Sequence, residues 1–421
     1  MSGLTPRVAR HIIQRMGEAG QPPDYGLSFV NVGNQVYLDI LAQEYLDRLL
    51  ESQRGSAFKL VQGYYGGGKT HFLHCLRDLG WLRGFLCSLV QLSPQECPYE
   101  DPLKVYRAVV SQLTAPPEAP GEVPTRGIGD LLRDFADGLA ARKTPDERAE
   151  WLRKTQRKIQ VDLVSFRRAV AAFLTCCWEG DASGEALLES WLRADPVPRG
   201  ELKNYGIYET IDQHNAFAAL RSLCQTLNGF GYPGMLLMFD EVDRNLSLSN
   251  RRIAALGDNL RQVVDLCGGA QLPGVLFVYA VPPEFLRLVV PEYPALDQRL
   301  RSPLPLSRIS PQATLIDLEK LDLQPEELLA AMGSKLLQVF QVAEGWKATE
   351  AIQQGNLQAL SRACARYSFE VGHRRTFVKS WIAFLHQQKE SGESWMSEEM
   401  AENLLMHGLP QGQSSADFLD V

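Results

Sequence analysis

The eight residues from Gly63 to Thr70 restrict what this chain can fold into more than any other part of its sequence. They read Gly-Tyr-Tyr-Gly-Gly-Gly-Lys-Thr and match the pattern G-x-x-x-x-G-K-[ST]. The compact run Ala57–Gln62, bounded by glycines, precedes them as a buried strand would, and Thr70–Leu79 follows with helical character. A glycine-rich turn between a strand and a helix can point successive N–H groups at phosphate oxygens. The sequence therefore predicts a phosphate-binding loop.

This pattern assigns a task to each kind of residue in the loop. Glycines allow unusual backbone angles, and the helix N-terminus adds a dipole that favours anions. Lys69 is expected to contact the β and γ phosphates of ATP, while the Thr70 hydroxyl binds Mg²⁺. A glycine-rich turn with an accidental lysine would not match all eight positions in this context. The predicted nucleotide-binding residues here are Gly63, Tyr64, Tyr65, Gly66, Gly67, Gly68, Lys69, Thr70 and the adjoining His71.

A second motif follows the apolar run Met235–Phe239, which ends in the carboxylates Asp240 and Glu241. Acids at a strand end are usually solvated turn residues, but the phosphate loop upstream reverses that expectation. The carboxyl ends of parallel strands meet at one edge of a sheet, which would bring an acid beside the loop. Asp240 is predicted to bind the nucleotide through Mg²⁺, and Glu241 to orient or activate the attacking water. The predicted reaction is ATP hydrolysis to ADP and phosphate.

Strand and helix patterns alternate along the chain. Further buried strands are expected at 85–92, 234–240, 274–281 and 314–318, with helices between them. This alternation predicts an α/β fold of the P-loop NTPase kind, a parallel sheet flanked by helices, with a helical insertion and a C-terminal helical lid. We expect an N-terminal helical segment over 1–55, a core over 56–322 with the insertion at about 128–205, the lid over 323–390 and a tail over 391–421.

Composition and charge argue against several classes of protein. The chain is 45% hydrophobic and 22% charged, which suits a folded core. No apolar run approaches the roughly 18 residues of a membrane span, and no signal-like region follows Met1, so we expect a cytoplasmic protein without membrane contact. A net charge of −7 gives no indication of direct DNA contact. The eight cysteines lack metal-binding or framework spacing and are expected to be free thiols.

Several motifs together resemble the bacterial BREX-type ATP-binding protein family. The resemblance runs from Thr5 to about Gln388, and its most specific part is the loop with its trailing His-Phe-Leu. It implies a P-loop ATPase of the AAA+ type, related to origin-recognition proteins, that acts in anti-phage defence beside a helicase or another DNA-processing partner. The motifs that carry it are Arg15-Met16-Gly17, Pro22-Pro23, Gly63–Leu73, Leu92-Ser93-Pro94 and Phe239-Asp240-Glu241.

The resemblance also implies catalytic arginines. Arg299 and Arg301 lie where AAA+ ATPases carry an arginine finger, which contacts the nucleotide of a neighbouring subunit, so a homo-oligomer is implied. Exposed arginines are more often solvated surface groups. Arg375 is our choice for a lid arginine that reaches the γ-phosphate, and Arg374 is interpreted as a surface residue. Tyr279 stands where a small polar residue is usual, which predicts slow turnover.

Two functions remain open from the sequence. The first is an ATPase whose nucleotide-driven lid motion controls assembly with itself or with a DNA-processing partner; the presence of Glu241 favours it. The second is a slow nucleotide-gated switch or scaffold that hydrolyses little ATP and binds a partner protein through its helical insertion. The unusual Tyr279 keeps the second reading open.

Overall fold

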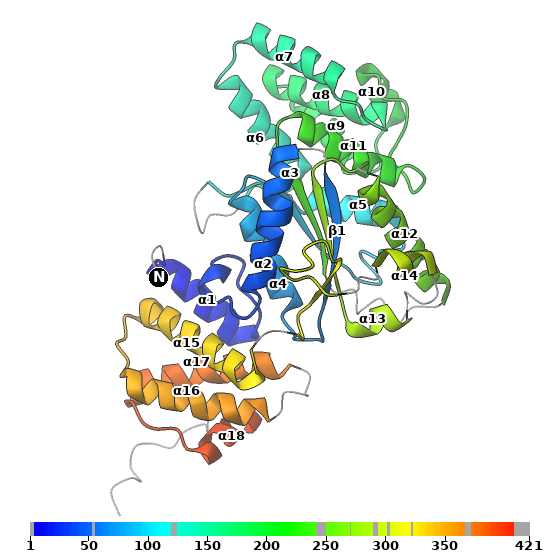
Figure 1. Ribbon diagram of the computed structural model, residues 1–421. Coiled ribbons are helices and arrows are strands. Elements are labelled where there is room, and N and C mark those ends of the chain that lie inside the picture. The colour runs from blue at the N-terminus through cyan, green and yellow to red at the C-terminus, as the bar shows by residue number, and fades with distance from the viewer. Residues whose placement is uncertain are drawn as a thin grey trace, which may run out of the picture. The chain divides into compact units, whose positions relative to one another are not determined.

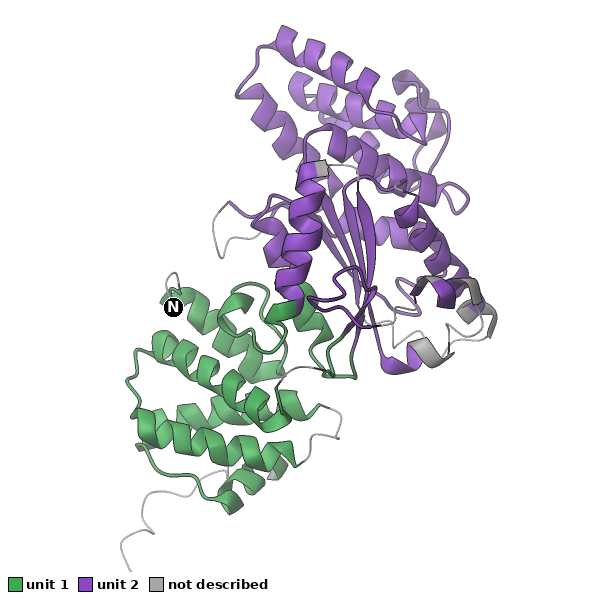
Figure 2. Cartoon of the chain, viewed as in Figure 1, with its two compact units in different colours: residues 1–36, 63–75, 317–421 green, residues 37–62, 76–316 purple. Residues whose placement is uncertain are grey.

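The computed structural model describes residues 4–52, 55–118, 124–240, 250–269, 271–288, 294–300, 304–320, 323–366 and 372–407. It divides into two compact units, each assembled from segments far apart in the sequence (Figure 2). Unit 1 comprises Met1–Val36, Gly63–Cys75 and Asp317–Val421, and unit 2 comprises Tyr37–Gln62 and Leu76–Ile316.

A six-stranded sheet in the order β3-β2-β4-β5-β1-β6 forms the core of unit 2 (Figure 1). The neighbouring pairs β1–β5, β4–β5 and β2–β4 are parallel, which confirms the predicted parallel sheet. The two-residue strand β3 pairs antiparallel with β2 and was not predicted, because it is too short to show a period. The strands are β1 Ser56–Gln62, β2 Leu86–Gln91, β3 Leu113–Thr114, β4 Met235–Asp240, β5 Val275–Val281 and β6 Leu315–Asp317.

Apolar composition explains the central position of β4 and β5. All of their residues are buried, as expected for strands covered on both faces by helices. In Figure 1, α3 lies on one side of the sheet and α12 on the other. The helices around the sheet are α2 Gln35–Leu41, a π-helical turn Ala42–Leu46, α3 Asp47–Ser52, α4 Lys69–Trp81, α5 Pro102–Ser111, α11 Ala216–Gly229, α12 Asn250–Gly268, α13 Pro283–Leu288 and α14 Pro294–Leu300.

One buried lysine of β1 forms hydrogen bonds with the segment that precedes β6. Lys59 is 1% exposed, and its Nζ donates to the Tyr45 hydroxyl and to the Ala313 carbonyl, each at 2.5 Å. Burial lowers the pKa of Lys59 to about 7. These contacts fix residues 312–313, which lie shortly before β6 in the chain. Glu319 follows that strand.

The insertion is helical, as predicted, and forms a bundle at one end of unit 2 (Figure 1). Its helices α6, α8 and α9 pack on one another, and α8 also contacts α11. Helix α7 has no buried residue; a capping box between Thr144 and Glu147 stabilises its first turn. The elements are α6 Ile128–Ala140, α7 Pro145–Lys158, α8 Val164–Glu179, α9 Ala182–Leu192, α10 Arg199–Leu202 and η3 Lys203–Tyr205.

Unit 1 has its own hydrophobic core, built from both ends of the chain. Helix α1 (Pro6–Ala19) begins at the Thr5 cap and buries Val8, Ile12 and Met16 in the cluster that holds the C-terminal helices. It packs against α15 and α17. From the sequence we expected 1–55 to form a separate helical segment. An amphipathic helix needs a partner that covers its apolar face, and for α1 that partner is the pair α15 and α17. The remaining elements are η1 Leu27–Phe29, α15 Pro325–Glu344, α16 Glu350–Ala365, α17 His373–Ser391 and α18 Glu398–His407.

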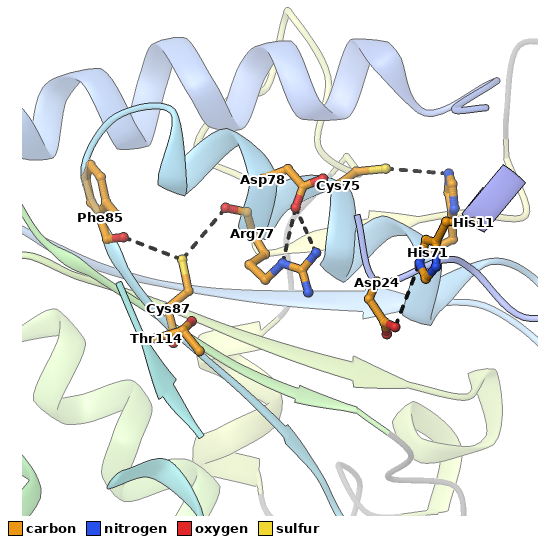
Figure 3. Close-up of polar contacts among 9 residues, drawn as sticks. All are labelled: His11, Asp24, His71, Cys75, Arg77, Asp78, Phe85, Cys87 and Thr114. Carbon is orange, nitrogen blue, oxygen red and sulfur yellow. Dashed lines mark hydrogen bonds and ion pairs between the residues drawn. The ribbon is translucent and has the colours of Figure 1, made fainter. Parts of the chain in front are cut away.

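The cysteines agree with the expectation of free thiols. All eight cysteines are free thiols, and every one except Cys177 is buried. Figure 3 shows the Cys87 thiol directed at the carbonyls of Arg77 and Phe85, at 3.8 Å from each. Among the helices of the described residues, none has both the length and the apolar character needed to cross a bilayer. Of the predicted tail over 391–421, residues 391–407 are described and include α18, and the rest lies outside the described residues.

Candidate functional site

The phosphate loop joins the end of β1 to the start of α4, as predicted. Gly66 and Gly68 have φ values of +77° and +93°, which favour glycine over any residue with a side chain. A Cβ atom on Gly67 would lie 2.5 Å from Glu319 Oε1 and 2.9 Å from the Tyr64 carbonyl oxygen. The three consecutive glycines are therefore required by the compact form of the loop.

Lys69 is held against the loop that precedes it. Its side chain is 6% exposed, and Nζ donates to the carbonyls of Gly63 at 2.8 Å and Tyr64 at 3.0 Å. An ammonium group has three donors, so these two bonds leave one for an anion. Thr70 follows in the first turn of α4 and is half-buried, whereas the rings of Tyr64 and Tyr65 are more than half exposed.

The first turn of the lid helix α17 lies beside the loop within unit 1. Gly372, with φ +88°, precedes this helix and gives no side-chain cap. Arg374 Nη1 donates to the Gly67 carbonyl at 2.7 Å, and Arg375 Nη1 donates to the Tyr65 hydroxyl at 3.0 Å. Cations in a first turn oppose the helix dipole, so Arg374 and Arg375 concentrate positive potential here instead of stabilising the helix.

The structure places Arg374, and not Arg375, in the more enclosed position of the two. The Arg374 side chain is 18% exposed, and its buried Nε has no hydrogen-bond partner. Burial lowers the pKa of Arg374, while the neighbouring Glu319 acts in the opposite direction. Arg375 instead stacks on the exposed Tyr65 ring, 4.9 Å from its centre. The interpretation of Arg374 as a surface residue was wrong, because adjacent positions in one turn cannot be distinguished without the packing around them.

Glu319 was missed by sequence reasoning. Its Oε1 accepts a hydrogen bond from the Tyr64 backbone N–H at 2.9 Å, and its Oε2 lies 4.0 Å from Arg374 Nη2. It follows the short strand β6 in a turn, and no local pattern marks it as part of a site. Its contacts with the loop bridge 255 residues of sequence.

His71 connects the loop helix to the N-terminal segment. His71 Nε2 lies 3.1 Å from Asn31 Oδ1, to which the ring donates in its Nε2–H tautomer. The Cys75 thiol lies 3.5 Å from the same nitrogen (Figure 3). Lys335 of α15 donates to the Asn31 carbonyl at 2.6 Å. Burial, and secondarily the charge of Lys335, lower the pKa of His71 to about 4, so the ring is neutral near pH 7. These contacts give His71 a packing role beside the loop.

The remaining predicted residues belong to unit 2. Asp240 ends β4 with 1% exposure, and its carbonyl accepts from the Leu92 N–H at 2.9 Å. Since β1 and β4 both run parallel to β5, Gln62 and Asp240 lie at the same edge of the sheet. Tyr279 of β5 is fully buried among aromatic rings, and its hydroxyl has no hydrogen-bond partner.

The side chains of three predicted catalytic residues are not among those described. Glu241 and Arg301 lie outside the described residues. Arg299 belongs to α14, but its side chain is not among those described.

A family model covers most of the chain. The family model described as BREX system ATP-binding protein BrxC/D matches residues 4–403. No curated protein matches the chain. Among solved structures, the chain is similar to the Aeropyrum pernix ORC2 protein in its ADPNP–ADP complexes, with 12% identity and a TM-score of 0.47, over 89% of this chain and 68% of that one.

Proposed function

The chain belongs to the BREX system ATP-binding protein BrxC/D family, and from this we propose that it is a Mg²⁺-dependent ATPase with its nucleotide on the loop Gly63–Thr70. One observation supports this most directly. The N-termini of α4 and α17 and the cations of Lys69 and Arg374 gather at one glycine loop of unit 1. Helix N-termini and fixed cations together favour a ligand with several negative charges, such as a nucleoside triphosphate.

Hydrolysis needs a metal and an activated water in addition to this anion site. We propose Thr70 and Asp240 as Mg²⁺ ligands, since hydroxyl and carboxylate oxygens are what this ion prefers. When bound, Mg²⁺ would neutralise charge that develops on the β and γ phosphates. Glu241, which follows directly on the buried strand β4, remains our proposed group for activating water.

The lid arginines offer a test of how the nucleotide is held. We expect Arg374→Ala to weaken ATP binding by about tenfold, because it removes a partly buried guanidinium that contacts the loop. Arg375→Ala should weaken binding by about twofold, since Arg375 rests on an exposed ring. Isothermal titration calorimetry with MgATP measures both, with thermal unfolding as the control for folding. If Arg375→Ala weakens ATP binding more than Arg374→Ala does, Arg375 is the arginine that contacts the phosphates.

A homo-oligomer with an arginine finger in trans is the further part of this proposal. Arg299 and Arg301 would then act only when two protomers meet, so hydrolysis per protomer should rise several-fold from nanomolar to micromolar protein. The Arg299→Ala, Arg301→Ala double variant should lose most turnover yet keep its ATP affinity, because Lys69 and Thr70 belong to the same chain as the bound nucleotide.

Steady-state phosphate release over a dilution series measures this directly. Mixing the double variant with Glu241→Gln should partly restore hydrolysis, because the second variant still carries its arginines. Flat activity per protomer, together with an inactive mixture, would instead support the slow switch that binds a partner through the insertion.

The biological setting rests on the family. Anti-phage defence is implied by the name of the family, and we propose that the ATPase acts there with a helicase or another DNA-processing protein. The buried aromatic Tyr279, in the place of a small polar residue, favours slow hydrolysis within this setting.

A further inference from the structure

Glu319 brings a negative charge into the cationic surroundings of the loop, and its position is fixed by a tight turn. The Asp317 carboxylate accepts from the Glu319 backbone N–H at 3.1 Å, and the Asp317 carbonyl accepts from the Lys320 N–H at 3.3 Å. From this turn the Glu319 side chain reaches the Tyr64 N–H. The same carboxylate oxygen occupies the space in which a side chain on Gly67 would begin. Glu319 is therefore in contact with the phosphate loop itself.

Glu319 could pair with Arg374 without lying this close to the loop. Its charge neutralises Arg374 only in part. The Glu319 carboxylate is 4.0 Å from Arg374 Nη2, at the outer limit of an ion pair, while Arg374 Nη1 is bonded to the Gly67 carbonyl. The Arg374 Nε is buried without a partner. A guanidinium that already contacts the loop through Nη1 is well placed to pair with a phosphate oxygen, and the carboxylate near Nη2 competes for the same guanidinium.

A glutamine in this place would serve the loop equally well as a hydrogen-bond acceptor. The carbonyl oxygen of an amide accepts from a backbone N–H as a carboxylate does. What the glutamate adds is charge, and a fixed negative charge a few ångströms from a phosphate site repels a ligand in proportion to the ligand's own charge. The effect is therefore larger for ATP than for ADP.

We propose that Glu319 is a specificity-determining residue that lowers the affinity of the loop for nucleotides and lowers it more for ATP than for ADP. This inference rests on the proposed nucleotide site at Gly63–Thr70. Glu319 acts by repelling the phosphates and by competing for Arg374. Glu319 thereby reduces the ratio of ATP affinity to ADP affinity that the cations of the loop would otherwise create.

The test compares Glu319→Gln with the wild type by isothermal titration calorimetry with MgATP and with MgADP. Glu319→Gln should tighten ATP binding by about fivefold and ADP binding by about twofold, since one unit charge is removed at short range. Raising the salt from about 50 mM to about 300 mM should shrink both gains. The matched control is Glu326→Gln, because Glu326 lies in the same unit but pairs with Arg362 on the exposed surface at 3.7 Å. It should leave both affinities unchanged.

A second variant separates charge from geometry. Glu319→Asp keeps the charge but shortens the side chain, and it should retain the wild-type ratio of ATP to ADP affinity. A ratio in Glu319→Asp that moves as far as in Glu319→Gln would overturn the proposal, as would tightening of both nucleotides by the same factor or of neither. A wild-type protein that binds no nucleotide would instead remove the proposed function itself, so the two failures are distinguishable.

Discussion

Lys69→Ala is expected to raise the Kd for MgATP by about 100-fold, because the one charge-assisted hydrogen bond that its remaining donor can make to phosphate is worth about 1.5–3 kcal/mol. Lys69 is buried against the loop, so water cannot substitute for the lost ammonium as it would at an exposed position. The bonds from Nζ to the carbonyls of Gly63 and Tyr64 also order the loop, and their loss adds to the effect.

The measurement is a calorimetric or fluorescence titration with MgATP, with Lys379→Ala as the matched control. Lys379 lies in α17 of the same unit, and its side chain is exposed, so removal of its charge should leave the Kd within about twofold of the wild type. Comparable thermal unfolding of both variants shows that the fold is retained. Wild-type affinity in Lys69→Ala would exclude Gly63–Thr70 as the nucleotide site.

Glu241→Gln is expected to bind MgATP with nearly unchanged affinity and to lower the hydrolysis rate by at least about 100-fold. The amide keeps the size of the side chain but cannot accept a proton from water. Glu241 directly follows Asp240, which is buried at the end of β4. Bound ATP should therefore persist, which chromatography of the extracted nucleotide measures.

The control for this variant is Glu209→Gln, the same chemical change at an exposed residue of unit 2. It should leave both binding and turnover unchanged. Hydrolysis at the parent rate in Glu241→Gln would assign the activation of water to a different group. A wild type that binds ATP but shows no turnover would favour the switch over the ATPase.

Residues close together in sequence allowed much of the fold to be predicted. The buried strands β4 and β5 are continuous apolar runs, and helix α7 of the insertion and helix α15 of the lid each begin with a proline and a capping box. The short strand β3 was missed, because two residues show no pattern that distinguishes a strand from a loop. The pairing of α1 with α15 and α17 was also missed, because an apolar helix face does not indicate which distant face it will meet.

By itself, the sequence determined the phosphate loop and the end of β4, because each is a contiguous motif whose backbone geometry depends on its own residues. Only the tertiary structure decided which residues surround the loop. Tyr64 and Glu319 are 255 residues apart, and Gly67 and Arg374 are 307 apart. Contacts over such separations form when packed helices and turns bring their side chains together, and the geometry of α17 directs Arg374 to the Gly67 carbonyl and Arg375 to the Tyr65 side chain.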